Sequence, residues 1–359
     1  MKIIIATGGS GGHIFPALQV AAKLREQGGE IFFVGTFGNF KEKIEKEGYR
    51  IEELGAKGLT TNSLKTISFS LVSMLKSTVK VNGILKDIKP QVVVGFGGYG
   101  AFPVIVAANL SRYPTLIHEQ NVIPGRANAF LAKFVDKIAI SFEKSRKFFP
   151  RARTILSGCP SRLPEPSYDR RQILKDFGLQ EGKNTFLICG GSQGSQKINN
   201  VFMQALPFLA SPLNLQVIHL AGQKDYAELK KKYAELHVDH FLTPFLDEMD
   251  KAYAVADLAI ARAGAVTVTE VSHFGLPTIF IPYPYAGGHQ KENALVLKEV
   301  NAAMLIEEKD LTPESLGKTI HEFLQQKPKN DEIKRRAQGV CLSDAADRLA
   351  REVMALTRV

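Results

Sequence analysis

Gly8-Gly9-Ser10-Gly11-Gly12-His13 separates the apolar run Ile3 to Ala6 from a helical pattern that extends from Ile14 to Leu24. A strand that ends at a glycine-rich turn and continues as a helix presents unpaired backbone N–H groups and the positive end of the helix dipole. Phosphate groups bind at such helix N-termini. The alternative is a tight βα turn with spare glycines, but four glycines in five positions carry an entropic cost unless the backbone itself is used. The stretch therefore predicts a phosphate or diphosphate site.

The residues around this turn narrow the kind of phosphate ligand. A Walker loop would end in Gly-Lys-Ser or Gly-Lys-Thr, whereas Gly12 is followed by His13. A dinucleotide fingerprint that begins at Gly9 would need a third glycine where Ile14 stands, and the next strand ends in Gly35-Thr36 without a ribose-binding acid. Both nucleotide hydrolysis of the Walker type and NAD binding are therefore disfavoured.

Short apolar runs alternate with helical stretches along the whole chain, which predicts an α/β protein with doubly wound parallel sheets. The predicted strands are Ile31 to Val34, Gln91 to Val94, Thr115 to His118, Lys137 to Ile140, Thr185 to Cys189, Leu215 to Leu220, Asp257 to Ala261, Thr278 to Ile281 and Ala302 to Ile306.

The length of 359 residues favours two domains, and the chain supplies a boundary between them. Three prolines lie between Pro160 and Ser167, which is typical of an extended hinge. After it, the run Thr185 to Cys189 leads into the glycine turn Gly190 to Ser195, so the opening motif recurs in outline. We expect one domain over residues 1–160, a second over 161–343, and a last helix over 344–359 that packs back on the first domain.

The net charge of +10 is concentrated in the first half of the chain. Residues 1–160 contain 22 Lys and Arg against 11 Asp and Glu, whereas residues 161–359 contain 24 against 25. Such an excess suits a nucleic-acid binder or a protein on an anionic membrane. Nucleic acid is disfavoured because the chain lacks Trp and its basic residues accompany aliphatic ones.

Compartment and membrane topology are also constrained. Three cysteines without a Cys-x-x-Cys pair fit a reducing cytoplasm, and the opening strand leaves no room for a signal peptide. The twenty uncharged residues from Val92 to Ser111 are long enough to span a bilayer, but glycines and Pro103 divide them into strand, loop and helix. We expect this segment to be buried α/β core.

Two further segments are candidates for ligand binding. The loop Gly95 to Gly100 follows a predicted strand; it is either an ordinary βα turn or, in a doubly wound sheet, part of the ligand crevice. In Arg262 to Glu270, a strand end leads into a helix whose early turns contain an acid. Such a carboxylate can accept both hydroxyls of a ribose, or it can simply favour the positive end of the helix.

Six motifs together resemble the MurG family of bacterial glycosyltransferases, in order and over nearly the whole chain. They are Gly8 to His13, Gly97-Gly98-Tyr99, His118-Glu119-Gln120-Asn121, Gly190 to Gly194, Arg262 to Glu270, and His289-Gln290 through Asn293-Ala294. The resemblance implies the GT-B fold of glycosyltransferase family 28. It also implies transfer of N-acetylglucosamine (GlcNAc) from UDP-GlcNAc to the 4-hydroxyl of N-acetylmuramic acid (MurNAc) in undecaprenyl-pyrophosphoryl-MurNAc-pentapeptide (lipid I), which yields lipid II for peptidoglycan.

The resemblance assigns roles residue by residue. The lipid acceptor would lie on the N-terminal domain, with its diphosphate at Gly9, Gly97, Gly98, Tyr99 and Gly100. The donor would lie mainly on the C-terminal domain, with Ser192 at its diphosphate, the Leu246 backbone at uracil, Glu270 at the ribose and Gln290 at the sugar. Further donor contacts would come from Ser10, Gly11, Gly12, Asn121, Arg162, Ala265, Val266, Thr267, Val268 and Thr269.

Two positions depart from the family pattern. Ser10 stands where threonine is usual, which keeps the hydroxyl, and Cys159 stands where asparagine is usual, while Arg162 is retained. The resemblance places the enzyme at the cytoplasmic face of the bacterial plasma membrane as a peripheral protein.

His13 is the candidate general base because it is the histidine at a phosphate loop and an ordinary histidine pKa suits proton acceptance from the acceptor hydroxyl. The alternative is that His13 only hydrogen-bonds a phosphate or caps the turn. Glu119 is the alternative base. No metal site is expected, because Asp-x-Asp is missing and no two histidines are four residues apart. We expect no cofactor; helix amides and arginine would then stabilise the leaving group.

A helix predicted over Thr66 to Lys89 is the candidate membrane surface. Val81, Leu85 and Ile88 belong to its core stripe, while the flank and far side combine apolar residues with lysines: Phe69, Val72, Leu75, Lys76, Val79 and Lys80. An apolar strip among lysines suits an anionic headgroup layer. The alternative is that a loop or a second subunit covers the strip.

Two other enzyme functions are alternatives, and the first of them shares the expected fold. One is a glycosyltransferase that acts on diacylglycerol, and the other is a UDP-GlcNAc 2-epimerase. The epimerase needs no lipid-facing surface, so vesicle binding distinguishes it from both transferases.

Overall fold

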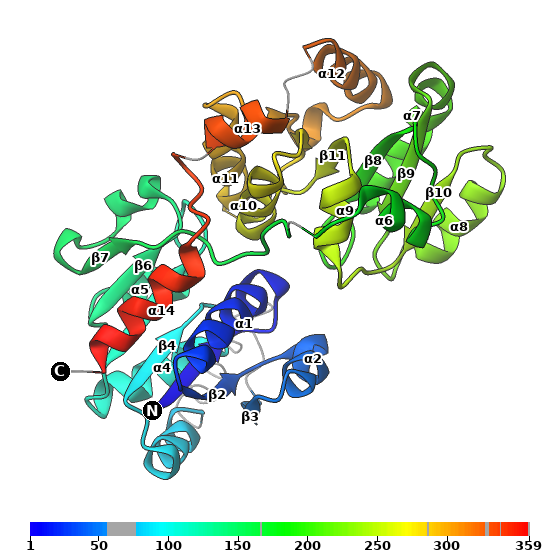
Figure 1. Cartoon of the computed structure of the whole chain (residues 1–359). Helices are drawn as coiled ribbons and strands as arrows, with labels where there is room; N and C mark the ends of the chain where they lie inside the picture. Colours follow the sequence, from blue (N-terminus) through cyan, green and yellow to red (C-terminus); the bar gives the residue numbers. More distant parts are fainter. Residues whose placement is uncertain (56–76, 166, 286, 327–329, 338, 358–359) are drawn as a thin grey trace, which may run out of the picture. The chain divides into compact units, whose positions relative to one another are not determined.

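The structure of the chain, a computed structural model, describes residues 1–55, 77–165, 167–285, 287–326, 330–337 and 339–357. These residues form two compact units (Figure 1). Unit 1 comprises Met1–Ser161 and Leu342–Val359, and unit 2 comprises Arg162–Cys341. Each unit contains one parallel sheet with helices on its faces, which confirms the prediction of two doubly wound α/β domains.

Unit 1 contains a seven-stranded sheet in the order β3-β2-β1-β4-β5-β6-β7, and every neighbouring pair is parallel. The strands are β1 Lys2–Thr7, β2 Glu30–Gly35, β3 Arg50–Glu53, β4 Val92–Gly95, β5 Thr115–Glu119, β6 Lys137–Ile140 and β7 Thr154–Leu156. The helices are α1 Gly11–Glu26, α2 Lys41–Lys46, a helix over residues 77–88, α4 Ala101–Leu110, α5 Arg126–Leu131 and α14 Ala345–Leu356, with 3-10 turns at Gly38–Phe40, Glu143–Phe148 and Arg151–Arg153.

Unit 2 contains a six-stranded parallel sheet in the order β10-β9-β8-β11-β12-β13. The strands are β8 Asn184–Cys189, β9 Leu215–Leu220, β10 His240–Thr243, β11 Leu258–Ala261, β12 Thr278–Phe280 and β13 Met304–Leu305. The helices are α6 Arg170–Asp176, α7 Gln196–Leu213, α8 Tyr226–Ala234, α9 Met249–Val255, α10 Ala265–Phe274, α11 His289–Lys298, α12 Pro313–Gln326 and α13 Asn330–Ala337, with the 3-10 turn η4 at Glu308–Asp310.

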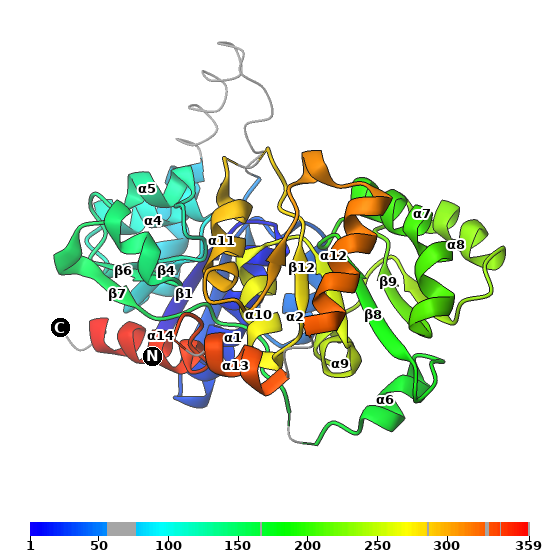
Figure 2. The same ribbon diagram turned by 90° about the horizontal axis from the view of Figure 1, so that it is seen from above.

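Two apolar cores cover the faces of the unit 1 sheet, because side chains alternate along each strand. On β1, Ile3 and Ile5 join the core beneath α1, whereas Ile4 joins the core beneath α4 and the 77–88 helix. The last helix of the chain, α14, supplies Leu349 and Val353 to the first of these cores. Figures 1 and 2 show α14 alongside α1, so the chain returns to unit 1 after completing unit 2.

Each sheet reverses its strand order at one point, between β1 and β4 in unit 1 and between β8 and β11 in unit 2. Ligands of doubly wound sheets bind at this switch point, outside the carboxyl ends of the strands. The segments that follow these four strands are the predicted glycine loops after β1, β4 and β8 and the Arg262–Gly264 turn after β11. The fold therefore places the glycine motifs of each unit side by side.

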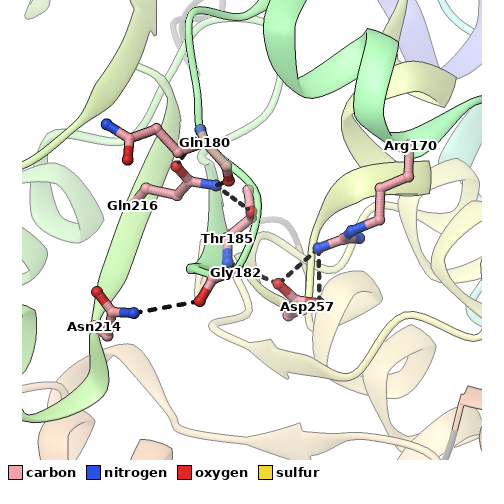
Figure 3. Close-up of polar contacts among 7 residues, drawn as sticks. All are labelled: Arg170, Gln180, Gly182, Thr185, Asn214, Gln216 and Asp257. Carbon is pink, nitrogen blue, oxygen red and sulfur yellow. Dashed lines mark hydrogen bonds and ion pairs between the residues drawn. The ribbon is translucent and has the colours of Figure 1, made fainter.

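The opposite end of the unit 2 sheet is closed by polar contacts among strand ends (Figure 3). The buried Gln216 amide donates to the Gln180 carbonyl at 2.8 Å and to the Thr185 hydroxyl at 3.0 Å. The Asp257 carboxylate accepts from the Thr185 N–H at 2.7 Å and from Arg170 at 3.0 Å. These bonds fix α6 against the strand ends far from the glycine loop.

Several expected elements differ from the structure or extend beyond the described residues. The strands β3, β7 and β10 were not among the predicted strands, and β13 is shorter than predicted. The segment Val92 to Ser111 forms β4, a loop and α4, as expected, and among the described helices none is long and apolar enough to cross a bilayer. Of the helix expected over 66–89, residues 66–76 lie outside the described part of the chain.

Candidate active site

In unit 1, the loops after β1 and β4 touch through their backbones. The Gly8 N–H donates to the Gly97 carbonyl at 2.9 Å, and a Cβ on Gly8 would lie 2.8 Å from the Gly98 Cα. Gly97 and Gly98 have φ angles of 87° and 79°, which favour glycine. The two loops therefore form one glycine surface beside the N-terminus of α1.

Gly100 packs closely against neighbouring backbone. It is buried, and a Cβ there would lie 2.5 Å from the Thr36 backbone nitrogen and 2.7 Å from the Thr7 carbonyl oxygen. Glycine at this position is explained by close packing of the loop on the ends of β1 and β2, so the expected contact of Gly100 with the diphosphate stays a prediction. Gly9 and Tyr99, by contrast, are exposed.

The first turn of α1 is open to an anion. The side chain of Ser10, at the N-cap position, does not cap the helix; its Oγ lies 2.8 Å from His13 Nδ1. The amides of Gly11 and Gly12 have no intrahelical acceptor by position. A Cβ on Gly12 would meet no described atom within 4 Å. This turn can therefore donate several N–H bonds to one phosphate.

His13 lies beside the glycine surface. A Cβ on Gly97 would be 3.3 Å from His13 Nε2, and one on Gly98 would be 3.3 Å from Nδ1. Burial lowers the pKa of His13 to about 4. The imidazole is therefore neutral near pH 7 and can accept a proton, and a bound anionic diphosphate would raise its pKa and strengthen it as a base.

Glu119 organises the β5–α5 loop. Its buried carboxylate accepts from the Asn121 N–H at 2.9 Å, the Asn121 side chain at 3.1 Å, the Gly125 N–H at 3.0 Å and the Asn128 side chain at 2.9 Å. Burial raises the pKa of Glu119, and these hydrogen bonds oppose that effect. Because each carboxylate oxygen of Glu119 already accepts two N–H hydrogen bonds, the geometry favours His13 over Glu119 as the base.

His118 is a structural histidine. Its Nε2 donates to the Gly158 carbonyl at 3.0 Å, so its Nδ1 is the acceptor for the Gln120 side-chain amide at 3.2 Å. Burial lowers the pKa of His118 to about 4, which keeps the ring neutral. The motif His118 to Asn121 thus fixes the loop that follows β5 rather than supplying several reactive groups.

Two buried amide oxygens in this region were missed by sequence reasoning. Gln120 and Asn128 each use their NH2 group on acceptors of the chain, and among the described residues Gln120 Oε1 and Asn128 Oδ1 have no hydrogen-bond partner. The Asn128 amide nitrogen would lie 3.5 Å from a Cβ on Gly97, next to His13. Asn128 is seven residues beyond the quoted motif, which left no local signal for it.

In unit 2, the loop Gly190 to Ser195 is a second glycine loop at the N-terminus of a helix, α7. Gly191 and Gly194 have φ angles of 90° and 76°, and a Cβ on Gly194 would lie 2.2 Å from the Ala221 carbonyl oxygen. A Cβ on Gly191 would meet no described atom within 4 Å, and Ser192 is exposed. The loop is therefore fixed on one side by packing and open on the other at the start of α7.

Gln290 and Asn293, on the helix that follows β12, hydrogen-bond to the turn after β11. The Gln290 side-chain oxygen accepts from the N–H groups of Ala263 at 3.2 Å and Tyr283 at 3.0 Å. Asn293 donates to the Ala263 carbonyl at 3.2 Å. Since the Gln290 oxygen is used twice by the backbone, its amide can donate to a ligand only through Nε2.

Glu270 is buried within unit 2 and already has protein partners. Its Oε1 accepts from the Arg162 backbone N–H at 3.4 Å and pairs with the Arg162 guanidinium at 3.5 Å, and the Tyr253 hydroxyl bonds to the same carboxylate. Burial raises the pKa of Glu270, and the positive charge of Arg162 opposes this. The structure thus joins two predicted donor residues, Arg162 and Glu270, to each other.

The remaining predicted donor residues differ in access. Val266, Thr267 and Leu246 are half-buried at the loop edge of unit 2. Val268 and Thr269 are fully buried; the Val268 N–H donates to the Gly264 carbonyl, and the Thr269 hydroxyl donates to the Ala265 carbonyl at 3.0 Å. Both side chains pack within the helix, so the expected contact of Val268 and Thr269 with the donor stays a prediction that their burial does not favour.

The comparisons with known proteins agree with this arrangement. Residues 3–140 match the glycosyltransferase family 28 N-terminal domain, and residues 185–349 match the C-terminal domain of the same family. The chain is 38% identical to a curated protein from Geotalea uraniireducens, with 98% of each chain covered. That protein is named UDP-N-acetylglucosamine--N-acetylmuramyl-(pentapeptide) pyrophosphoryl-undecaprenol N-acetylglucosamine transferase.

Solved structures give the same result. The crystal structure of Acinetobacter baumannii MurG is 27% identical, with a TM-score of 0.74 over 99% of both chains. UDP-GlcNAc 2-epimerase from Neisseria meningitidis has a TM-score of 0.69 at 13% identity, which shows a shared fold alone. The chain therefore belongs to glycosyltransferase family 28 and, within it, to the MurG family of UDP-GlcNAc-dependent N-acetylglucosaminyltransferases.

Proposed function

We propose that the two units divide the substrates of this transferase between them. Unit 1 binds the diphosphate of lipid I at the glycine surface of the β1 and β4 loops, and unit 2 binds UDP-GlcNAc at the loops after β8, β10, β11 and β12. The 4-hydroxyl oxygen of MurNAc forms a bond to the anomeric carbon of GlcNAc. The bond from that carbon to the β-phosphate oxygen breaks, and UDP leaves with the electron pair.

The observation that carries this proposal is the presence of a glycine loop at the switch point of each sheet. The loops after β1 and β4 share a backbone hydrogen bond, and the loop after β8 is open at Gly191 and Ser192. In both units the loop leads into a long helix, α1 or α7, whose N-terminus favours an anion. A lipid diphosphate and a nucleoside diphosphate supply one such anion each.

His13 is the proposed base. It is neutral near pH 7, lies beside the glycine surface, and has its Nδ1 in contact with Ser10. With Nδ1 as the acceptor for the Ser10 hydroxyl, the same ring donates from Nε2; with the opposite tautomer, Nε2 takes the proton of the attacking hydroxyl. We assign the second tautomer to the reactive state.

The leaving group is stabilised by backbone N–H groups and arginine in this proposal. Among the described residues, no cluster of three or more His, Cys, Asp and Glu side chains forms a ligand set for a metal ion. The first turns of α7 and α10 supply amides at the switch point of unit 2 instead. If these amides and arginine suffice, the transfer reaction proceeds in the presence of a chelator.

Calorimetry tests the donor half of the proposal. If Glu270 holds the ribose, Glu270→Ala weakens UDP-GlcNAc binding by about 1.5–3 kcal/mol, the range of a hydrogen bond to a charged group. Glu228→Ala, which removes an exposed carboxylate paired with Lys232 on α8, is the control and leaves binding unchanged. Equal UDP-GlcNAc affinity in Glu270→Ala and the wild type would remove Glu270 from the donor site.

We further propose that unit 1 rests on an anionic membrane through an apolar surface that we call the α4–α5 surface. It consists of Val79, Phe102, Leu110, Phe130, Lys133 and Phe134. Val79 and Leu110 are 71% and 72% exposed. Phe130 packs against both Phe102 and Phe134 at 5.6 Å between ring centroids, with the Lys133 amine over its ring.

The 77–88 helix and α4 are neighbours in this surface, since the Ser111 hydroxyl donates to the Asn82 side chain at 3.2 Å. Of the residues expected from sequence, Val79 is exposed as predicted, and the Lys80 amine donates to the Glu53 carbonyl at 2.9 Å. Phe69, Val72, Leu75 and Lys76 lie outside the described residues. Apolar side chains at the acyl boundary with lysines at the headgroups would hold the protein near its lipid acceptor.

A further inference from the structure

The guanidinium of Arg262 lies beneath the donor loop of unit 2. Arg262 follows the end of β11, and its side chain is only 10% exposed. Its Nη2 donates to the Ser195 hydroxyl at 2.8 Å and its Nη1 donates to the Ile281 carbonyl at 3.0 Å. The ring of Tyr283 lies 5.4 Å from the guanidinium carbon. Three loops at the switch point are thus joined by one buried cation.

Glu308 balances this cation. It begins the 3-10 turn η4 just after β13, its side chain is 18% exposed, and its carboxylate pairs directly with Arg262 Nη2. The neighbouring Glu307 points to other partners, Lys291 at 2.5 Å and Lys309 at 3.4 Å. The Arg262–Glu308 pair is therefore a separate, largely buried ion pair directly behind Ser195.

A diphosphate bound to the amides of the Gly190 to Ser195 loop would interact electrostatically with both Arg262 and Glu308. The guanidinium attracts it through Ser195, and the Glu308 carboxylate, one contact further away, repels it. Charges in a partly buried site interact more strongly than in bulk water. UDP has a terminal phosphate and so carries more negative charge than UDP-GlcNAc, which means that the repulsion acts more on the product than on the substrate.

We propose that Glu308 is a positioning residue that sets the affinity of the donor loop for UDP. It holds Arg262 against Ser195 and offsets part of its charge, so that UDP leaves after transfer. This inference rests on the proposed function, in which the Gly190 to Ser195 loop binds the donor diphosphate. With the ion pair in place, the loop has enough affinity to bind UDP-GlcNAc but not so much that it retains UDP, the more charged product.

The test is calorimetry of UDP and UDP-GlcNAc with the full-length protein. Glu308→Gln keeps an oxygen for Arg262 and removes the charge, so it is expected to bind UDP about three- to tenfold more tightly, with a smaller gain for UDP-GlcNAc and a gain that shrinks in about 0.5 M salt. Glu308→Asp keeps the charge and is expected to stay near the wild type. Glu307→Gln is the matched control on the adjacent residue and leaves UDP affinity unchanged.

Two outcomes would overturn the inference. One is UDP binding to Glu308→Gln that equals or falls below that of the wild type; the other is an equal gain for UDP and UDP-GlcNAc that salt does not change. Gly191→Asp distinguishes the inference from the function beneath it. If Gly191→Asp binds UDP as well as the wild type, the Gly190 to Ser195 loop is not the donor site and the proposed function fails. If Gly191→Asp loses UDP binding while Glu308→Gln binds UDP as the wild type does, only the role of Glu308 is excluded.

Discussion

His13 is the residue on which the proposed chemistry depends. His13→Ala should lower kcat by roughly 10²- to 10⁴-fold and leave UDP-GlcNAc affinity nearly intact, because general-base assistance appears only in the transition state. Single-turnover transfer at saturating substrates and calorimetry measure the two quantities separately. Wild-type turnover in His13→Ala would exclude it as the base.

The buried histidines predict an acid-labile fold. Burial lowers the pKa of His118 to about 4 and that of His219 to about 3, whereas their unfolded value is 6.5. Below pH 6.5 the unfolded chain binds more protons, so stability that is complete above pH 6.5 is lost as the pH falls toward 4, by about 3 kcal/mol for His118.

Urea unfolding between pH 7 and pH 5 measures this loss. His219→Asn should show a flatter dependence on pH than the wild type, while the variant of an exposed histidine, His237→Asn, keeps the wild-type slope. A wild-type midpoint that does not move over this range would contradict the assignment of neutral buried rings.

At the scale of residues, the sequence identified the motifs better than it predicted the contacts of their side chains. The glycines at positions 8, 97 and 98 identified these loops in the sequence, and the structure explains the glycines by backbone contact between the loops. Gln290 and Asn293 were quoted as a motif, yet their contacts with Ala263 join positions about 30 residues apart, which no local pattern records. The motif that contains Val268 and Thr269 does not tell which side of the helix faces the core, and the structure shows that both side chains are buried.

At the scale of elements, the β5–α5 loop is organised by one carboxylate. Glu119→Gln places an NH2 group among four N–H donors, which should lower the free energy of unfolding by about 2–3 kcal/mol through unsatisfied buried groups. The exposed control Glu143→Gln, which loses only a surface pair with Arg146, should change it by under about 1 kcal/mol.

Denaturant unfolding and turnover together decide the role of Glu119. A destabilised variant that keeps most of its kcat supports an organising role. A stable variant whose kcat falls by a hundredfold or more would make Glu119 the base, which was the alternative that the sequence left open.

Central strands were predictable, whereas the edge strands β3, β7 and β10 were not predicted. β1 and β6 contain the continuous apolar runs Ile3 to Ala6 and Ile138 to Ile140, because both faces of these strands are buried. β3 has the sequence Arg-Ile-Glu-Glu at one edge of the unit 1 sheet, where exposed side chains leave no apolar run to detect. At the edges of the unit 2 sheet, β10 is only half-buried and was not predicted, whereas β13 was predicted from Ala302 to Ile306 and is shorter in the structure.

At the scale of the whole molecule, the charge excess and the α4–α5 surface belong to the same unit. Val79→Glu/Leu110→Glu should bind anionic vesicles less well than the wild type at low salt, because two carboxylates enter the apolar surface. Phe208→Glu is the matched control, since Phe208 is 77% exposed but lies on α7 in unit 2. Co-sedimentation measures all three proteins; equal binding of the double variant and the wild type would contradict the membrane proposal.

The central claim is metal-independent transfer of GlcNAc from UDP-GlcNAc to a lipid-linked acceptor by a chain whose two units divide the substrates. The direct measurement incubates the protein with UDP-GlcNAc labelled in the sugar and a short-chain lipid I analogue, in the presence of a chelator. We predict that the label appears in the lipid fraction as a disaccharide with inverted anomeric configuration, with one UDP released per transfer. Label that stays on the nucleotide as an epimerised sugar, or transfer that requires added metal, would contradict the account.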